Sequence, residues 1–222
     1  MQYSSEMIAE IVARVMKEGG VQPTSATGGD GLVPVGVSAR HIHLTQADVE
    51  TLFGAGYQLT PFKDLSQPGQ YACKEQLTLV GPSMRAIEKV RVLGPVRKAT
   101  QVEISRTDSF VLKVKPPVRE SGDIAGSAGV TIVGPKGIVT VKEGCIIANR
   151  HIHMSLDEAR RFNVQDGEYV DVEVIDGAER PTVFLGVQVR ANEAFRLEMH
   201  IDTDDANAAG IGNGAKVKLI KK

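Results

Sequence analysis

A histidine-rich motif that occurs twice limits what this chain can fold into. Residues 40–45 have the sequence Arg-His-Ile-His-Leu-Thr, and residues 150–155 repeat it without gaps as Arg-His-Ile-His-Met-Ser. A carboxylate follows three residues later in each copy, at Asp48 and Glu158. A hydroxyl residue with an acid three positions on is the signature of a helix N-terminus. Each copy therefore predicts a strand that carries His-x-His and runs into a short helix.

The rest of the chain is typical of a protein with many turns and short strands. Its 23 glycines and 10 prolines lie between short runs rich in β-branched residues. The segment 165–168 (Gln-Asp-Gly-Glu) predicts a tight turn before a strand. The expected strands are Gln76–Val80, Lys89–Leu93, Gln101–Ser105, Phe110–Val114, Gly129–Val133, Ile138–Val141, Tyr169–Val174, Thr182–Val189, Glu193–Ile201 and Ala215–Ile220. Two similar halves of this kind predict a mainly β protein with a few short helices and two small β-barrel domains.

Composition and charge exclude several classes of protein. The formal net charge is −1, whereas a general nucleic-acid binder carries a basic excess. No apolar run is long enough to cross a bilayer, and charges interrupt the apolar positions near the N-terminus, unlike in a secretory signal. Cys73 and Cys145 form no short-spaced framework of the kind found in disulfide-stapled secreted proteins. We therefore expect a cytoplasmic protein without a membrane span.

The N-terminal segment has the pattern of a tethered helix. Apolar residues follow helical spacing in residues 1–20, at Met7, Ile8, Ile11, Val12 and Val15. Residues 21–31 are rich in Gly, Ser, Thr and Pro and are typical of a flexible linker. The helix either folds back on the main domain or docks on another protein.

The two His-x-His pairs predict metal binding. Side chains two apart on a strand share one face, so each pair presents two imidazoles side by side and turns Ile42 or Ile152 the other way, into a core. Neutral imidazole is the commonest protein metal ligand. The five histidines of the chain are His41, His43, His151, His153 and His200.

Each pair needs a third ligand, because catalytic zinc usually has about three protein ligands and one open position. His200 is the one histidine outside the pairs. The other pair needs a carboxylate, and spacing alone leaves Glu103, Glu75 and Asp64 open. Basic residues near Glu103 suggest an anion site, because guanidinium binds phosphate in a bidentate fork. They are Arg85, Lys89, Arg91, Arg97, Lys98 and Arg106.

Three segments together resemble one enzyme family. They are residues 35–44 (VGVSARHIHL), 60–65 (TPFKDL) and 149–155 (NRHIHMS). They resemble the phosphate propanoyltransferases of bacterial microcompartments, the PduL-type phosphotransacylases, over about residues 33–220. The resemblance implies reversible conversion of acyl-CoA and phosphate to acyl phosphate and CoA. The acyl group would be propanoyl or acetyl, in a pathway such as propanediol degradation.

The resemblance also implies an architecture and a set of site residues. It implies two β-barrel domains, residues 32–39 with 149–222 and residues 40–148, with the active site between them. One zinc would be held by His41, His43 and Glu103, and the other by His151, His153 and His200. Arg97 would be the catalytic, phosphate-binding arginine. The coenzyme A site would be lined by Ser38, Lys63, Arg91, Leu93 and Asn207. Cobalt or iron would also suit imidazole and carboxylate ligands.

The N-terminal helix acquires a role from the same resemblance. Members of the family that work inside microcompartments carry such a helix as an encapsulation peptide, so a shell protein is the expected partner and the lumen the expected location. A homodimer is implied too.

Two other functions stay open on the residues alone. One is a dinuclear metal hydrolase, whose usual (β/α)₈ barrel has long regular helices. The other is a non-catalytic metal-binding module associated with a protein shell.

Overall fold

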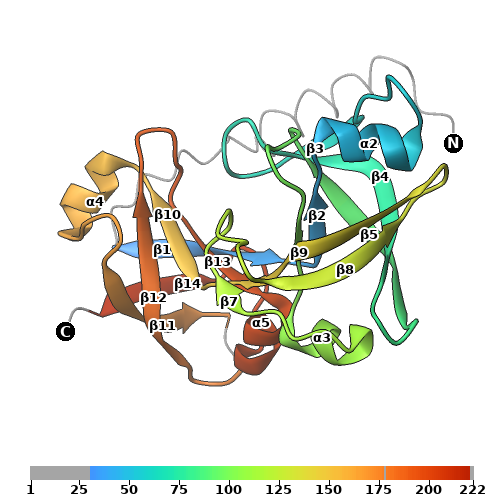
Figure 1. The fold of residues 1–222 in the computed structure, drawn as a ribbon. Coiled ribbons are helices and arrows are strands. Elements are labelled where there is room, and N and C mark those ends of the chain that lie inside the picture. Colours follow the sequence, from blue (N-terminus) through green and yellow to red (C-terminus); the bar gives the residue numbers. More distant parts are fainter. Residues whose placement is uncertain (1–30, 178, 221–222) are drawn as a thin grey trace, which may run out of the picture. The chain divides into compact units, whose positions relative to one another are not determined.

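The computed structural model describes residues 31–177 and 179–220, and the expected helix 1–20 and almost all of the linker 21–31 lie outside this part of the chain. The described residues form two six-stranded barrels with short helices (Figure 1). The prediction of a mainly β chain with two barrels and the His-x-His motif in both halves is confirmed. None of the helices in residues 31–177 and 179–220 is long and apolar enough to span a membrane.

The first barrel is closed by the first strand and five strands of the C-terminal half. Its order is β1-β13-β10-β12-β11-β14. The strands are β1 (Leu32–Ser38), β10 (His151–Met154), β11 (Tyr169–Asp176), β12 (Val183–Ala191), β13 (Glu198–Asp202) and β14 (Lys216–Ile220). Its buried core includes Ile152 and Met199, both 0% exposed.

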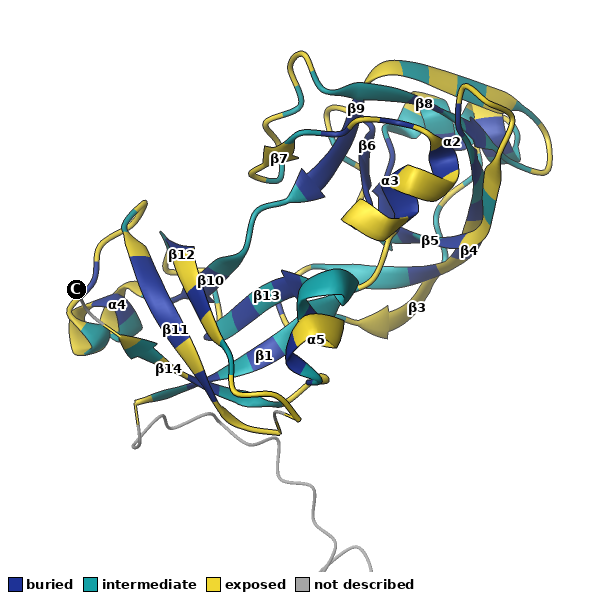
Figure 2. Cartoon of the chain, turned by 90° about the horizontal axis from the view of Figure 1, so that it is seen from below, coloured by how far each residue is buried: buried dark blue, intermediate teal, exposed yellow. Residues whose placement is uncertain are grey.

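The second barrel is built from the strands between these two parts. The pairings run β4-β5-β2-β6-β9-β8 and return to β4, with β3 and β7 added at its edges. The strands are β2 (His41–His43), β3 (Pro61–Asp64), β4 (Tyr71–Val80), β5 (Ala86–Gly94), β6 (Gln101–Glu103), β7 (Val118–Arg119), β8 (Ala128–Val133) and β9 (Ile138–Ala148). A separate core contains Ile42, again 0% exposed. The isoleucine of each His-x-His motif is thus buried as predicted. Figure 2 shows buried residues along strands of both barrels, among them β9, β10 and β11.

Each His-x-His strand follows a strand that belongs to the other barrel. β1 closes the first barrel and leads into β2 of the second, whereas β9 closes the second barrel and leads into β10 of the first. The strands also correspond in direction. β1 runs parallel to β13 and β9 runs parallel to β6, the two strands that carry the expected third ligands. The two halves therefore share one topology, with their first strands exchanged.

The short helices begin where the sequence predicts. α2 (Gln46–Phe53) and α4 (Leu156–Phe162) start after Thr45 and Ser155, whose hydroxyls accept the backbone N–H of Asp48 and Glu158. Ser155 and Glu158 form a complete capping box. The turn expected at 165–168 is present, with Gly167 at φ 79 and the Glu168 N–H donating to the Gln165 carbonyl.

The strand prediction for Phe110–Val114 is wrong. Most of that segment lies in helix α3 (Arg106–Leu112), where Phe110 is 66% exposed. A capping box between Ser105 and Asp108 starts the helix and outweighs the β-branched and aromatic residues that favour a strand. The strand expected at Glu193–Ile201 is also shorter than predicted. Asn192 accepts the Ala194 N–H in a turn, and β13 begins only at Glu198.

Polar contacts join the two barrels. The side chain of Gln67, between β3 and β4, donates to the carbonyl of Arg196 at 3.0 Å and accepts its N–H at 3.2 Å. The neighbouring Ser66 hydroxyl donates to Glu198 on β13. On another side, the N–H of Thr107 in α3 donates at 2.7 Å to Asp204 in helix α5 (Thr203–Ala209). These contacts position the strands that carry the histidines.

Candidate metal centre

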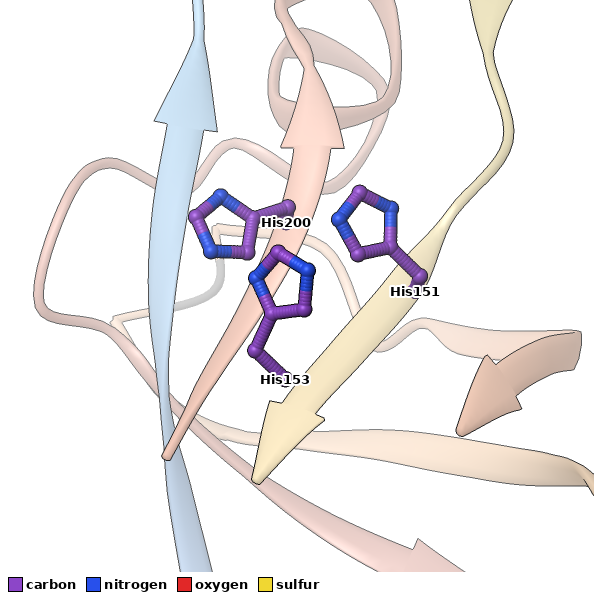
Figure 3. Close-up of side chains that lie close together, drawn as sticks. All are labelled: His151, His153 and His200. Carbon is purple, nitrogen blue, oxygen red and sulfur yellow. The ribbon is translucent and has the colours of Figure 1, made fainter. Parts of the chain in front are cut away.

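Two groups of three side chains could each hold a metal ion. The first group consists of His41 and His43 on β2 with Glu103 on β6, and the second of His151 and His153 on β10 with His200 on β13. Within each group the potential ligand atoms all lie within 4.8 Å of one another. Figure 3 shows the second group, with three imidazoles converging from two neighbouring strands. The structure thus brings together the six residues expected from the sequence and the family resemblance.

Strand register explains why each third ligand meets its histidine pair. β2 and β6 are antiparallel with His41 directly opposite Glu103, and β10 and β13 are antiparallel with His151 directly opposite His200. Directly opposed residues of an antiparallel pair have their Cβ atoms about 4.5–5.5 Å apart. Of the carboxylates left open by spacing, Glu75 instead accepts hydrogen bonds from Tyr57 and Thr60, and Asp64 is exposed.

The histidine rings leave nitrogens that suit a cation. His41 Nδ1 bonds the Ala39 carbonyl and His151 Nδ1 bonds the Asn149 carbonyl, each at 2.8 Å, so that each Nε2 is turned away from the backbone. His43 Nδ1, His153 Nδ1 and His200 Nε2 are buried and have no hydrogen-bond partner within residues 31–177 and 179–220. Buried polar atoms are almost always paired, so unpaired ring nitrogens in both groups fit metal ligation.

Burial keeps most of these imidazoles neutral, which is the metal-binding form. Burial and, to a smaller extent, the nearby His41 lower the pKa of His43 to about 3. Burial and neighbouring histidines likewise lower the pKa of His153 to about 2 and that of His151 to about 4. His41 differs because the Glu103 carboxylate outweighs burial and raises its pKa.

The Glu103 carboxylate is held so that one oxygen stays available. Oε1 accepts Gln101 Nε2 at 2.6 Å and the Ser121 hydroxyl at 2.9 Å, whereas Oε2 lies 3.4 Å from His41 Nε2. Burial alone would raise the pKa of Glu103, but the adjacent His41 lowers it well below its usual range. Glu103 is thus an ionised carboxylate with a free oxygen that faces the histidines.

Arg97 is joined to the first group through the same serine. Its Nη1 donates to the Ser121 hydroxyl at 3.0 Å, and its backbone N–H donates to the carbonyl of Leu44, the residue after β2. Burial lowers the pKa of Arg97, which remains a cation. The structure therefore brings the predicted phosphate-binding arginine within two hydrogen bonds of a predicted metal ligand.

Sequence reasoning missed a second arginine, which lies close to the second group and to Arg97. Arg190 on β12 lies opposite His153. Its positive charge contributes to the lowered pKa values of Arg97, His151 and His153. Its guanidinium lies 5.9 Å from the ring centroid of Phe195, which packs against His153. No ion pair or hydrogen bond to its side chain is found in residues 31–177 and 179–220. Two neighbouring positive charges are suited to binding an anion.

The sequence also gave no reason to single out Ser121, Gln101 or Glu198. Glu198 lies beside the second group, with Oε2 3.1 Å from His200 Nε2, although the geometry is not that of a hydrogen bond. Glu198 does not belong to the three residues whose atoms cluster within 4.8 Å. None of these residues stands in a recognisable motif. Strand pairing brings in Gln101 on β6 and Glu198 on β13, and the loop after β7 brings in Ser121.

One pocket is lined by residues of both groups. His41 and Glu103 contribute from one group and His151 and His200 from the other, together with Ser38, Arg40 and Asn149. A small molecule in this pocket can therefore contact both groups at once.

The five residues expected to line a coenzyme A site are spread over several elements. Ser38 at the end of β1 lines the shared pocket. Lys63 is exposed on β3, and Arg91 on β5 donates to the carbonyls of Cys73 and Lys74 and lies 5.6 Å from the Phe62 ring centroid. Leu93 is half-buried on β5, and Asn207 is exposed on α5.

The fold and the site define a two-barrel protein with two potential metal centres that share a pocket. A family model described as phosphate propanoyltransferase matches residues 34–212. The phosphate propanoyltransferase of Lachnoclostridium phytofermentans is 55% identical over 215 residues, covering 97% of each chain. That of Thermotoga maritima is 55% identical over 187 residues, covering 84% of this chain and 88% of its own. That of Clostridioides difficile is 44% identical over 218 residues, covering 98% and 97%.

The chain belongs to the phosphate propanoyltransferase family. The family expected from the sequence is thereby confirmed, as is the prediction that the chain is an enzyme, a transferase of acyl groups. The barrels also differ from the (β/α)₈ barrel that is usual for the hydrolase alternative.

Proposed function

We propose that this chain catalyses the reversible reaction of an acyl-CoA, propanoyl-CoA or acetyl-CoA, with phosphate to give acyl phosphate and CoA, with the help of two metal ions. The observation that carries the proposal is the shared pocket, which is lined by two residues of each three-residue group. Arg97 supports it, because Ser121 joins this arginine to Glu103. Transfer between a thioester and a phosphate requires the metal ligands and the arginine to lie close together, so that both substrates are held in one place.

The ligand sets suit zinc, with three protein ligands and an open position in each, and cobalt or iron as alternatives. His41, His43 and Glu103 would hold one ion, and His151, His153 and His200 the other. When bound, such ions polarise a carbonyl and favour the ionised form of a nearby acid.

The chain's own residues bind and orient the phosphate. Arg97 forms a charge-assisted pair with phosphate oxygens, and Ser121 fixes its guanidinium through the bond to Nη1. Arg190, which has no carboxylate partner among the described residues, adds a second positive charge near Arg97. The two cations hold the phosphate so that one of its oxygens faces the electrophilic carbonyl carbon of the thioester.

The chemical step is a direct transfer. A phosphate oxygen forms a bond to the carbonyl carbon, the carbon–sulfur bond breaks, and the sulfur leaves with the electron pair. The proton lost by phosphate balances the one that the CoA thiolate gains. A covalent acyl-enzyme is disfavoured, because both thiols are buried and burial raises the pKa of Cys73 to about 11 and that of Cys145 to about 12.

Encapsulation in a bacterial microcompartment is part of the proposal. It rests on the apolar stripe of residues 1–20, the polar linker 21–31 and the family resemblance. The partner would be a shell protein that receives the helix in a groove, and the catalytic unit would be a homodimer. Coenzyme A would contact Ser38, Lys63, Arg91, Leu93 and Asn207.

The test is release of free CoA thiol from propanoyl-CoA by the full-length chain. We expect release to require phosphate, to stop after metal is removed by a chelator, and to return when zinc is added. Thiol release at the same rate without phosphate would indicate a hydrolase. Full phosphate-dependent turnover in protein proved metal-free by elemental analysis would contradict the metal-assisted mechanism.

A further inference from the structure

The duplication extends beyond the histidines to a pair of charged residues in each half. Arg40 and Arg150 each come immediately before the first histidine of a motif. Asp108 lies five residues after Glu103, and Asp205 lies five residues after His200. Each aspartate also occupies the third position of the short helix that follows the strand of the third ligand. The Arg and the Asp therefore stand at matching places around the two groups.

In the second barrel the pair is close, and its carboxylate is buried whereas the arginine is 43% exposed. Arg40 Nε donates to Asp108 Oδ2 at 2.9 Å, and Nη2 lies 2.7 Å from Oδ1, a bidentate arrangement. The Asp108 side chain is 4% exposed, and its Oδ2 also accepts the backbone N–H of Ser105 at 3.2 Å. Because Arg40 adjoins His41 and Ser105 lies two residues after Glu103, one carboxylate joins the two chain segments that carry the ligands.

The first barrel repeats the arrangement in a looser form. Arg150 Nε lies 3.6 Å from Asp205 Oδ2, and both side chains are about one-third exposed (35% and 31%). Arg150 adjoins His151, which lies opposite His200, just as Arg40 adjoins His41 opposite Glu103. The guanidinium of Arg150 also lies over the Phe184 ring at 5.5 Å.

We infer that Arg40–Asp108 and Arg150–Asp205 are matched positioning pairs, one for each metal centre, that hold the His-x-His strand in register with the strand of the third ligand. The inference rests on the proposed metal binding. It has two physical grounds. A shift between the two strands would separate the opposed ligands. An arginine without its carboxylate would also place a positive charge beside a site for a divalent cation.

A direct role of Arg40 in substrate binding is the main rival, since Arg40 lines the shared pocket. The geometry disfavours it. Two of the guanidinium's donor groups already contact Asp108, which leaves the pair formally neutral and less able to attract an anion. The two roles differ in their effects, because a positioning pair affects metal affinity and a substrate arginine affects only the KM for a substrate.

The experiment follows metal transfer from the zinc-loaded full-length protein to a chromophoric chelator. The variants are Arg40→Gln, Arg40→Lys and Arg150→Gln. Arg160→Gln is the matched control, because Arg160 pairs with Asp157 on the surface of α4. Loss of a partner outside the ligand shell typically lowers metal affinity about 10- to 100-fold. We expect Arg40→Gln to weaken one of the two bound equivalents to this extent and leave the other unchanged.

The remaining variants test the match between the halves. Arg150→Gln should weaken the other equivalent, and by less, because its ion pair is longer and more exposed. Arg40→Lys should recover part of the affinity, since an ammonium can still pair with Asp108. The absorption spectrum of cobalt-loaded protein identifies the affected site, because one ligand set contains a carboxylate and the other contains three imidazoles.

Two results would overturn the inference. The first is chelator kinetics of Arg40→Gln that match those of Arg160→Gln, with a raised KM for phosphate or CoA in the Arg40 variant alone. The second is equal weakening of both equivalents by Arg40→Gln with a lowered melting temperature, which would indicate a general structural role. If Arg40→Gln does not fold, the same comparison applies to Arg40→Lys. Wild-type protein that binds no metal would refute the proposed function itself.

Discussion

Replacing Arg97 with alanine should raise the phosphate concentration required for turnover and leave the metals in place. Arg97 is partly buried, and in the described part of the chain its side chain makes one hydrogen bond, to Ser121. Its other donors are therefore available to phosphate. Hydrogen bonds to a charged group contribute about 1.5–3 kcal/mol, which corresponds to roughly a 10- to 150-fold rise in the KM for phosphate.

The same contacts predict that metal content does not fall. Without Arg97, Ser121 still accepts Gln101 Nε2 and still donates to Glu103, so the carboxylate keeps both of its partners. Initial rates over a phosphate series, with elemental analysis of the same samples, test both statements. Lys98→Ala is the control, because Lys98 is the exposed neighbour in the same loop. An unchanged KM for phosphate in Arg97→Ala, or a loss of metal, would refute the role given to Arg97.

Three further predictions concern the cysteines, the N-terminal segment and the core. Because burial raises the pKa of Cys73 to about 11 and that of Cys145 to about 12, no more than about one thiol in 1,000 is ionised at pH 8, so both should resist a thiol reagent in the native state. The Cys73→Ala, Cys145→Ala double variant should keep its turnover; complete loss in a folded, metal-loaded protein would point to a covalent intermediate. Deleting residues 1–20 should leave the purified enzyme active and abolish co-purification with microcompartment shells, and a dead truncation would show instead that the helix is needed for catalysis. Ile152→Ala, at a fully buried position, should lower the free energy of unfolding in denaturant by about 2–5 kcal/mol, whereas a change below about 0.5 kcal/mol would contradict its place in the core.

Local rules predicted the parts of the site that lie close together in the sequence. Two histidines separated by one residue must share a face of a strand, and Ile152 between them must face the other way, as the buried isoleucine shows. The helix start at Ser155 follows from a hydroxyl and an acid three residues apart. The same rule, applied to Ser105 and Asp108, would have corrected the strand that was expected over Phe110–Val114.

Spacing could not choose the third ligand of the first group. Glu103 lies 60 residues after His43 in the sequence, and Glu75 and Asp64 are nearer. The register of β2 against β6 decides between them, and register depends on how the whole barrel closes. The family resemblance supplied Glu103 where the residues alone left three candidates open.

Residues that lie outside any motif were not predicted at all. Arg190 reaches the site because β12 pairs in parallel with β10, and Ser121 reaches it from the loop after β7. Asp108 and Asp205 likewise meet Arg40 and Arg150 from distant parts of the chain. Such contacts leave no periodic signal in the sequence.

The central claim is that each chain binds two metal ions, one in each three-residue group. A crystal structure of zinc-loaded protein, with anomalous data collected on both sides of the zinc edge, tests it directly. The account predicts two anomalous peaks per chain, one among His41, His43 and Glu103 and one among His151, His153 and His200. A fully loaded crystal with no peak at either group, or with its zinc bound to other residues, would contradict it.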